Sequence, residues 1–180
     1  MTVHHYLAEG LESGALVEVP PLYPTMVVRR IFMTEDVARL LRGPWESPDL
    51  ELSDSEWEYR CGFVRRQFDR FINGKRVGVA LDPQSDAENC FFKRIHPIED
   101  EVWEIRCRVP PPGVRVFGRF AETDIFVAMH WRLRKDMGYW GDPSWDHAIE
   151  VCRGFWGTLF ASTNPKSGNT NDYVRNAFPV

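Results

Sequence analysis

Residues 113–135 read GVRVFGRFAETDIFVAMHWRLRK, and they give the clearest strand signal in the chain. Residues 114–120 and 124–133 alternate in polarity along the chain, which is typical of strands with one buried face. The four residues AETD between them predict a tight hairpin. The stretch carries four arginines, a lysine and a histidine, although the net charge of the whole chain is −4.

A third strand is predicted at residues 102–109, VWEIRCRV. The four residues PPPG join it to the strand at residues 114–120. With two four-residue connections, Cys107 lies opposite Val116 and Phe120 lies opposite Ile125. One face of the three strands is then apolar throughout and is expected to pack on helices. Its predicted members are Trp103, Ile105, Cys107, Val109, Val114, Val116, Gly118, Phe120, Ile125, Val127, Met129, Trp131 and Leu133.

The opposite face of the predicted strands is strongly basic. In the same register, Arg108 lies opposite Arg115 and Arg115 lies opposite His130, with Arg106 and Arg132 beside them. Like charges directly opposite each other destabilise a sheet, so a bound anion would relieve the repulsion. Guanidinium groups match phosphate oxygens. On the same face, Phe117 and Phe126 offer stacking surfaces for bases, so this face is a candidate for nucleic-acid contact.

Helices are predicted on both sides of these strands. Residues 25–33 read as a strand, after which Thr34 caps a short helix that ends near Gly43. The capping box Ser53-x-x-Glu56 begins a helix that ends near Asn73. Its buried stripe is Trp57, Cys61, Val64, Phe68 and Phe71. Residues 77–81 read as a short strand, and Asp142-Pro143 begins a last helix that runs to about Phe160.

Length and charge predict one domain with additions at both ends. We expect an arm over residues 1–23, a domain over residues 24–160 and a polar tail over residues 161–180. Residues 1–59 carry 4 basic and 11 acidic side chains, whereas residues 60–135 carry 15 basic and 10 acidic ones. The acidic arm could therefore neutralise the basic face within the molecule.

Cysteine and histidine spacing favours neither a metal site nor a redox pair. Cys61, Cys107 and Cys152 fall at apolar positions and are expected to be reduced core residues, which suits a cytoplasmic protein. No segment approaches the ~20 apolar residues of a membrane span, and the first residues do not read as a signal peptide. We therefore expect no metal, no cofactor and no membrane contact.

The segments VWEIRCRV, VRVFGRF and IFVAMHWRLRK, followed by a helix, resemble the RelE/HigB/ParE superfamily of bacterial toxins, especially its phage-derived HigB-like branch. The order strand, helix, helix, strands, helix over roughly residues 25–160 is also similar. The resemblance implies an α+β fold in which a small twisted antiparallel sheet packs on an N-terminal helical pair, with a C-terminal helix.

The resemblance implies a metal-independent endoribonuclease toxin that cleaves messenger RNA, usually on the ribosome, and is paired with an antitoxin protein. Arginines would stabilise charge that develops on phosphorus, and a general acid would protonate the leaving oxygen. The implied catalytic residues are Arg106, Arg115, His130 and Arg132, and the general acid is either His130 or Tyr139. The implied RNA-binding residues are Lys93, Arg94, Arg108, Phe117, Arg119, Phe126, Arg134 and Lys135.

Two alternatives remain open because the chain is longer and more acidic than members of this superfamily usually are. The first is a non-catalytic binding or structural protein on the same fold, possibly phage-encoded, that acts in a protein complex. The second is a ParE-like inhibitor of a DNA topoisomerase, because a shared fold does not fix a function.

Overall fold

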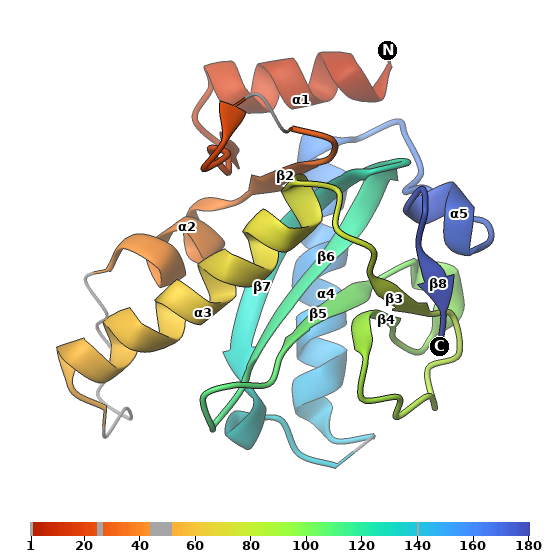
Figure 1. Ribbon diagram of the computed structural model, residues 1–180. Coiled ribbons are helices and arrows are strands. Elements are labelled where there is room, and N and C mark those ends of the chain that lie inside the picture. Colours follow the sequence, from red (N-terminus) through yellow and green to blue (C-terminus); the bar gives the residue numbers. More distant parts are fainter. Residues whose placement is uncertain (1, 25–26, 44–51, 140) are drawn as a thin grey trace.

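In the computed structural model, which describes residues 2–24, 27–43, 52–139 and 141–180, the strands form one mixed sheet (Figure 1). Its order is β1-β2-β7-β6-β5-β4-β3-β8. β2 runs parallel to β7, and β3 runs parallel to both β4 and β8, whereas the other neighbouring pairs are antiparallel. The strands are β1 Val17–Glu18, β2 Arg30–Met33, β3 Gly78–Ala80, β4 Cys90–Arg94, β5 Trp103–Cys107, β6 Val114–Glu122, β7 Ile125–Leu133 and β8 Phe178–Pro179.

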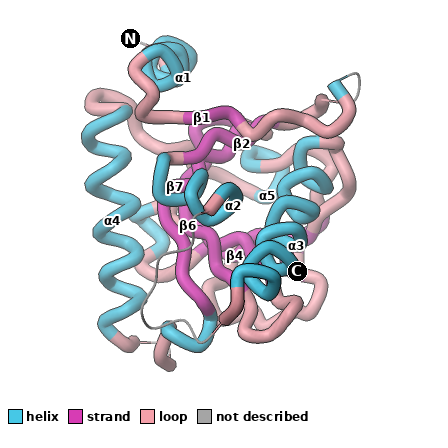
Figure 2. The backbone as a smooth tube through the Cα atoms, turned by 90° about the vertical axis from the view of Figure 1, so that its left-hand side faces the viewer, coloured by secondary structure: helices cyan, strands magenta, loops and turns pink. Residues whose placement is uncertain are grey.

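Helices lie on both faces of this sheet, which Figure 2 shows between α4 on one side and α3 on the other. α2 lies on the same side as α3, and α1 crosses the upper end of the molecule (Figure 1). The helices are α1 Val3–Glu12, α2 Glu35–Arg42, α3 Asp54–Ile72, α4 Pro143–Leu159 and α5 Thr170–Tyr173. The short 3₁₀ turn η2, Ile98–Asp100, precedes β5 in the chain, and the short 3₁₀ turn η3, Arg134–Asp136, follows β7.

Local sequence signals set where the long helices begin. The side-chain oxygen of Ser53 accepts a hydrogen bond from the backbone N–H of Glu56, whose carboxylate accepts one from the backbone N–H of Ser53. The predicted capping box of α3 is therefore confirmed. Asp142 caps α4 by accepting from the N–H of Ser144 at 2.9 Å. Thr34 precedes α2 as predicted, but its hydroxyl donates to the carbonyl of Met129 in β7 instead of capping the helix.

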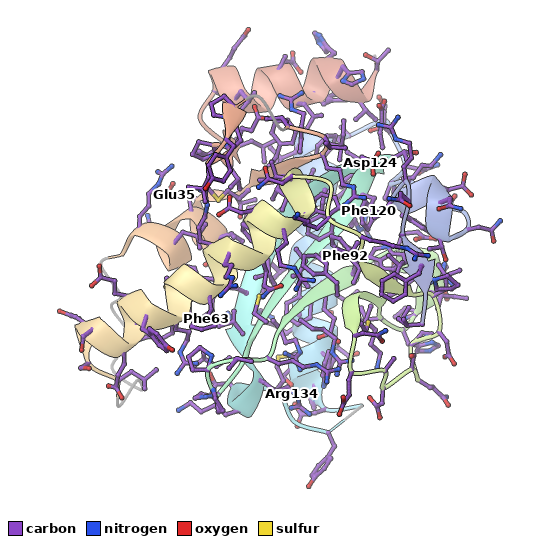
Figure 3. All side chains as sticks on the ribbon, viewed as in Figure 1. Glu35, Phe63, Phe92, Phe120, Asp124 and Arg134 are labelled. Carbon is purple, nitrogen blue, oxygen red and sulfur yellow. The ribbon has the colours of Figure 1, made fainter. Side chains whose placement is uncertain are left out.

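Two apolar clusters fill the spaces on either side of the sheet. The first packs the stripe of α3 and the buried side chains of α2 against the sheet, with Phe92 and Phe120 at its centre (Figure 3). All five predicted stripe residues of α3 belong to it. The second cluster packs α4 and α1 against Phe117, Val127 and Met129. The free cysteines found at 61, 90, 107 and 152 are all buried.

The mixture of helices and strands is confirmed, but the finer fold prediction is wrong. The sheet is large and partly parallel, the helical pair follows β2, and a second helical layer covers the other face. The strands at 102–109, 114–120 and 124–133 and the short strand at 77–81 are present with shifted ends, whereas α1, β4, α5 and β8 were not predicted. α1 buries only Tyr6, Leu7 and Gly10, too few for a clear periodic signal.

The N-terminal arm and the C-terminal tail pack on each other and on the sheet. The hydroxyls of Tyr6 in α1 and Ser162 lie 2.6 Å apart. In the tail, the Tyr173 hydroxyl donates to Glu101 at 2.8 Å, and Arg175 pairs with Asp124 at the upper end of the sheet (Figure 3).

The acidic side chains of the arm that form ion pairs in the described structure, Glu9 and Glu18, do not pair with the arginines of the central strands. Glu18 pairs with Arg30, at 2.6 Å between Oε1 and Nε. α1 lies at the upper end of the molecule, whereas Arg134 is labelled at the lower end (Figures 1 and 3). The expectation that the arm neutralises the basic face is therefore wrong.

Candidate anion-binding site

The three central strands bring Arg106, Arg115 and Arg132 into one row. Arg106 of β5 lies opposite Arg115 of β6, which lies opposite Arg132 of β7. Directly opposed residues point to the same face, so three of the four predicted catalytic residues are neighbours.

The predicted register of the first hairpin is wrong by two residues, and that of the second is wrong by one or two residues along its length. In the first hairpin, Cys107 lies opposite Val114, so the connection between the strands is six residues long instead of the predicted four. Arg60 of α3 donates hydrogen bonds to the carbonyls of residues 110, 111 and 112, which fixes this longer loop. In the second hairpin Glu122 lies opposite Ile125, so the connection is two residues long. The register shifts between Phe120 and Glu122, so Phe120 lies opposite Phe126 instead of Ile125.

A bulge at Met129 changes the faces of β7. Phe117 lies opposite His130 and Gly118 lies opposite Ala128, which leaves Met129 as the extra residue. Residues before the bulge therefore point to faces opposite to those predicted. Phe126 packs in the first cluster on the α3 side, whereas Val127 and Met129 pack in the second cluster beneath α4.

α4 covers the face that was expected to be an open basic surface. Because the bulge puts apolar side chains on that face too, it needs a helix to shield it from water. Trp145, Ala148 and Cys152 of α4 pack in the same cluster as Phe117 and Met129. As a result Arg115, Arg119 and His130 are buried, and the expectation of an exposed basic face is wrong.

One carboxylate partly neutralises the buried arginine row. Glu104, whose side chain is 3% exposed, lies 2.9 Å from Nε of Arg115 and 3.5 Å from Nε of Arg106. Lys93 of β4 lies directly opposite Glu104. Burial lowers the pKa of Arg115, and Glu104 acts in the opposite direction. The row is therefore a cationic cluster held in place by a single buried acid.

His130 and Tyr139 occupy very different surroundings. Nδ1 of the buried His130 lies 2.9 Å from Oδ2 of Asp36 in α2, and the ring of His147 lies 6.0 Å away. Nε2 of His130 is buried without a hydrogen-bond partner among the described residues. Tyr139 is 91% exposed. In this conformation neither candidate general acid shares an open site with the arginine row.

The other predicted RNA-binding residues are dispersed over the molecule. Lys93 lies 3.9 Å from Asp86, and Arg94 lies 3.4 Å from Glu101. Arg119 is buried over the ring of Trp156 in α4, at 5.8 Å from the centroid. Arg134 and Lys135 are exposed on η3. They therefore do not line one surface.

Arg106 and Arg108 instead meet arginines from α3 and from the segment before β3. A pocket of about 270 Å³ is lined by Arg70, Arg76, Arg106 and Arg108, with Glu88 as the acidic residue on its wall. We call it the arginine pocket. Its remaining lining residues are Phe63, Gln67, Val77, Gly78, Asn89, Cys90, Phe91, Val109 and Phe178.

The guanidinium groups of the arginine pocket are incompletely satisfied. Nε and Nη1 of Arg106 and Nε of Arg108 are buried without a hydrogen-bond partner among the described residues. The contact of Arg106 with Glu104, at 3.5 Å, is too long for a well-formed hydrogen bond. Buried N–H groups without acceptors are costly. An anion in the pocket would balance the charge of its four arginines.

The sequence predicted anion contact for two of the four arginines in this pocket. Arg106 and Arg108 were predicted to face a polyanion, whereas Arg70 shows no signal in the sequence except that it lies off the buried stripe of α3. Arg76 belongs to the basic pair Lys75-Arg76, a pattern more often solvated than functional. No local pattern joins position 70 to position 106, because the pocket forms only when α3 packs beside β4 and β5.

Comparison with family models, with curated proteins and with solved structures finds no match to this chain. Among the residues that the structure describes, no group of three or more histidine, cysteine, aspartate or glutamate side chains is arranged to hold a metal ion. None of the helices in that part of the chain is long and apolar enough to cross a membrane.

Proposed function

We propose that this protein is a non-catalytic RNA-binding protein that holds phosphate groups of RNA in the arginine pocket. The observation that carries the proposal is the lining of the pocket, where four arginines stand against one acidic side chain, Glu88. Phosphate oxygens are strong acceptors that match the guanidinium fork. The pocket also opens beside α3, whose outer side carries further arginines.

The positions of the implied catalytic residues support the non-catalytic part of this proposal. Arg115 is buried against Glu104, and His130 is buried against Asp36. A reacting phosphate would have to reach both side chains beneath α4. A general acid must come within hydrogen-bond reach of the leaving oxygen, and His130 cannot do so from this position.

The test is RNA binding by fluorescence anisotropy at several salt concentrations. Arg76→Gln and Arg106→Gln should each weaken binding about tenfold and reduce the salt slope by about one. Arg39→Gln is the matched control, because Arg39 is exposed on α2 and pairs only with Glu35 among described residues. Arg76 is exposed and makes no ion pair in the described structure, so its variant tests the pocket without disturbing Glu104. Equal affinity of all four proteins would refute the proposal.

An endoribonuclease toxin is the second candidate, because Arg106, Arg115 and Arg132 do lie in one row. The strand β2, the pair α2 and α3, the strands β4 to β7 and then α4 also follow the element order of the RelE/HigB resemblance. Controlled expression in a bacterium tests it. A toxin would stop growth and fragment messenger RNA, and Arg132→Ala would relieve both effects. Normal growth with intact message on expression of the unaltered chain would eliminate this candidate.

A further inference from the structure

The outer side of α3 carries two aromatic side chains followed by two arginines. Tyr59, Phe63, Arg66 and Arg70 follow one another at spacings of four, three and four residues, so they share one stripe of the helix. The buried stripe that begins at Trp57 lies on the other side. Tyr59 is 62% exposed, and Arg66 and Arg70 are exposed as well.

A groove follows this stripe at the N-terminal half of α3. It has a volume of about 460 Å³ and is lined by Ser55, Glu58, Tyr59, Gly62, Phe63 and Arg66. The rings of Tyr59 and Phe63 meet edge to face, with centroids 5.0 Å apart. A Cβ added at Gly62 would meet nothing within 4 Å, so the groove is open above the helix backbone.

The groove and the arginine pocket are neighbours. Phe63 lines both of them. Arg70 lines the arginine pocket and also a second groove that it shares with Arg66 and the exposed side chains of Leu22 and Tyr23. A ligand that occupied the arginine pocket could therefore extend along α3 past Arg70 and Arg66. The acidic side chains beside this path are Asp69, which is paired with Arg65 at 3.0 Å, and Glu58 in the groove.

We infer that the groove along α3 is a base-stacking subsite, so that the ligand of this protein is single-stranded RNA. The inference rests on the proposed function, because the arginine pocket holds the phosphates. Aromatic rings stack on bases of any sequence, and arginines beside them neutralise the backbone. A duplex hides its base faces, so it can offer only phosphates to this surface. An acidic peptide with aromatic residues is the competing occupant.

The experiment compares three probes: a single-stranded RNA of about 12 nucleotides that contains 2-aminopurine, the same RNA as a duplex, and inorganic polyphosphate. The unaltered protein should bind the single strand at least about tenfold more tightly than the duplex and quench the 2-aminopurine fluorescence. Tyr59→Ala should weaken single-strand binding about tenfold, abolish the quenching and leave polyphosphate binding unchanged. Tyr59→Phe keeps the ring and should bind like the unaltered protein.

The outcomes separate this inference from the function on which it rests. If Arg76→Gln weakens the binding of RNA and polyphosphate but Tyr59→Ala changes neither, the stacking subsite is refuted and RNA binding stands. If neither probe binds the unaltered protein, both proposals fail. If a copolymer of glutamate and tyrosine binds more tightly than the single strand and depends on Tyr59, the groove is a peptide site and the inference is overturned.

Discussion

Replacing Glu104 by glutamine should strongly destabilise the protein. The change keeps the shape of the side chain but removes the one carboxylate that lies against Arg115 and Arg106, at 2.9 and 3.5 Å. The three side chains are 3%, 7% and 12% exposed, so water cannot replace the lost charge. Two guanidinium groups would then face each other across β5 and β6 in a medium of low polarity.

The expected loss is about 3–5 kcal/mol of unfolding free energy, the cost of leaving a buried charge without its partner. Unfolding entropy is about 2.1 cal/mol/K per residue, which gives ~0.4 kcal/mol/K for a chain of this length. The melting temperature should therefore fall by roughly 8–13 °C. This is a large part of the 5–15 kcal/mol that holds a typical domain folded.

Thermal unfolding followed by circular dichroism measures this effect, with Glu18→Gln as the control. Glu18 also pairs with an arginine, Arg30, at 2.6 Å, but the two side chains are 35% and 40% exposed. Exposed pairs contribute up to about 1 kcal/mol, so the control should melt within ~3 °C of the unaltered protein. If Glu104→Gln melts like its control, the arginine row is hydrated, and the assignment of a buried cluster beneath α4 is refuted.

Two further predictions concern the packing of the sheet and its response to alkali. Gly118→Ala should cost about 3 kcal/mol because the new methyl group would overlap the carbonyl oxygen of Val127, whereas Gly154→Ala, with open space at its Cβ, should be neutral or slightly stabilising. Urea unfolding measures both, and equal midpoints would contradict the close approach of β6 and β7. Burial raises the pKa of the Cys107 and Cys152 thiols from 9 to about 12. The uncharged thiols therefore contribute to the free energy of unfolding. This contribution is complete below pH 9 and is lost as the pH rises to 12. The urea concentration at the unfolding midpoint should therefore decrease as the pH is raised from about 9 to about 11. The decrease should be smaller in a variant with alanine at both positions. A midpoint that stays constant over this pH range would show that the thiols are accessible.

Local patterns in the sequence determined several elements correctly. The capping box at Ser53 and the stripe from Trp57 to Phe71 placed α3, because a helix repeats every 3.6 residues whatever it packs against. The alternation in residues 102–133 placed the three central strands for the same kind of reason. It also assigned the faces of β5 and β6 correctly, since an error of two residues in register leaves a side chain on its own face.

The tertiary structure decided what these strands present to solvent. The first hairpin's register depends on Arg60, which binds a loop about 50 residues away. The bulge at Met129 reverses the faces of part of β7, and the apolar side chains that it exposes are covered by α4. One inserted residue is enough to reverse inside and outside, because strand periodicity is two.

The sequence by itself thus determined that arginines from neighbouring strands come together. Only the tertiary structure decided that Arg115 is enclosed with Glu104, while Arg106 and Arg108 meet Arg70 and Arg76 at a pocket. The physical reason is that charge and periodicity are properties of a segment. Burial depends on which other segments pack against it.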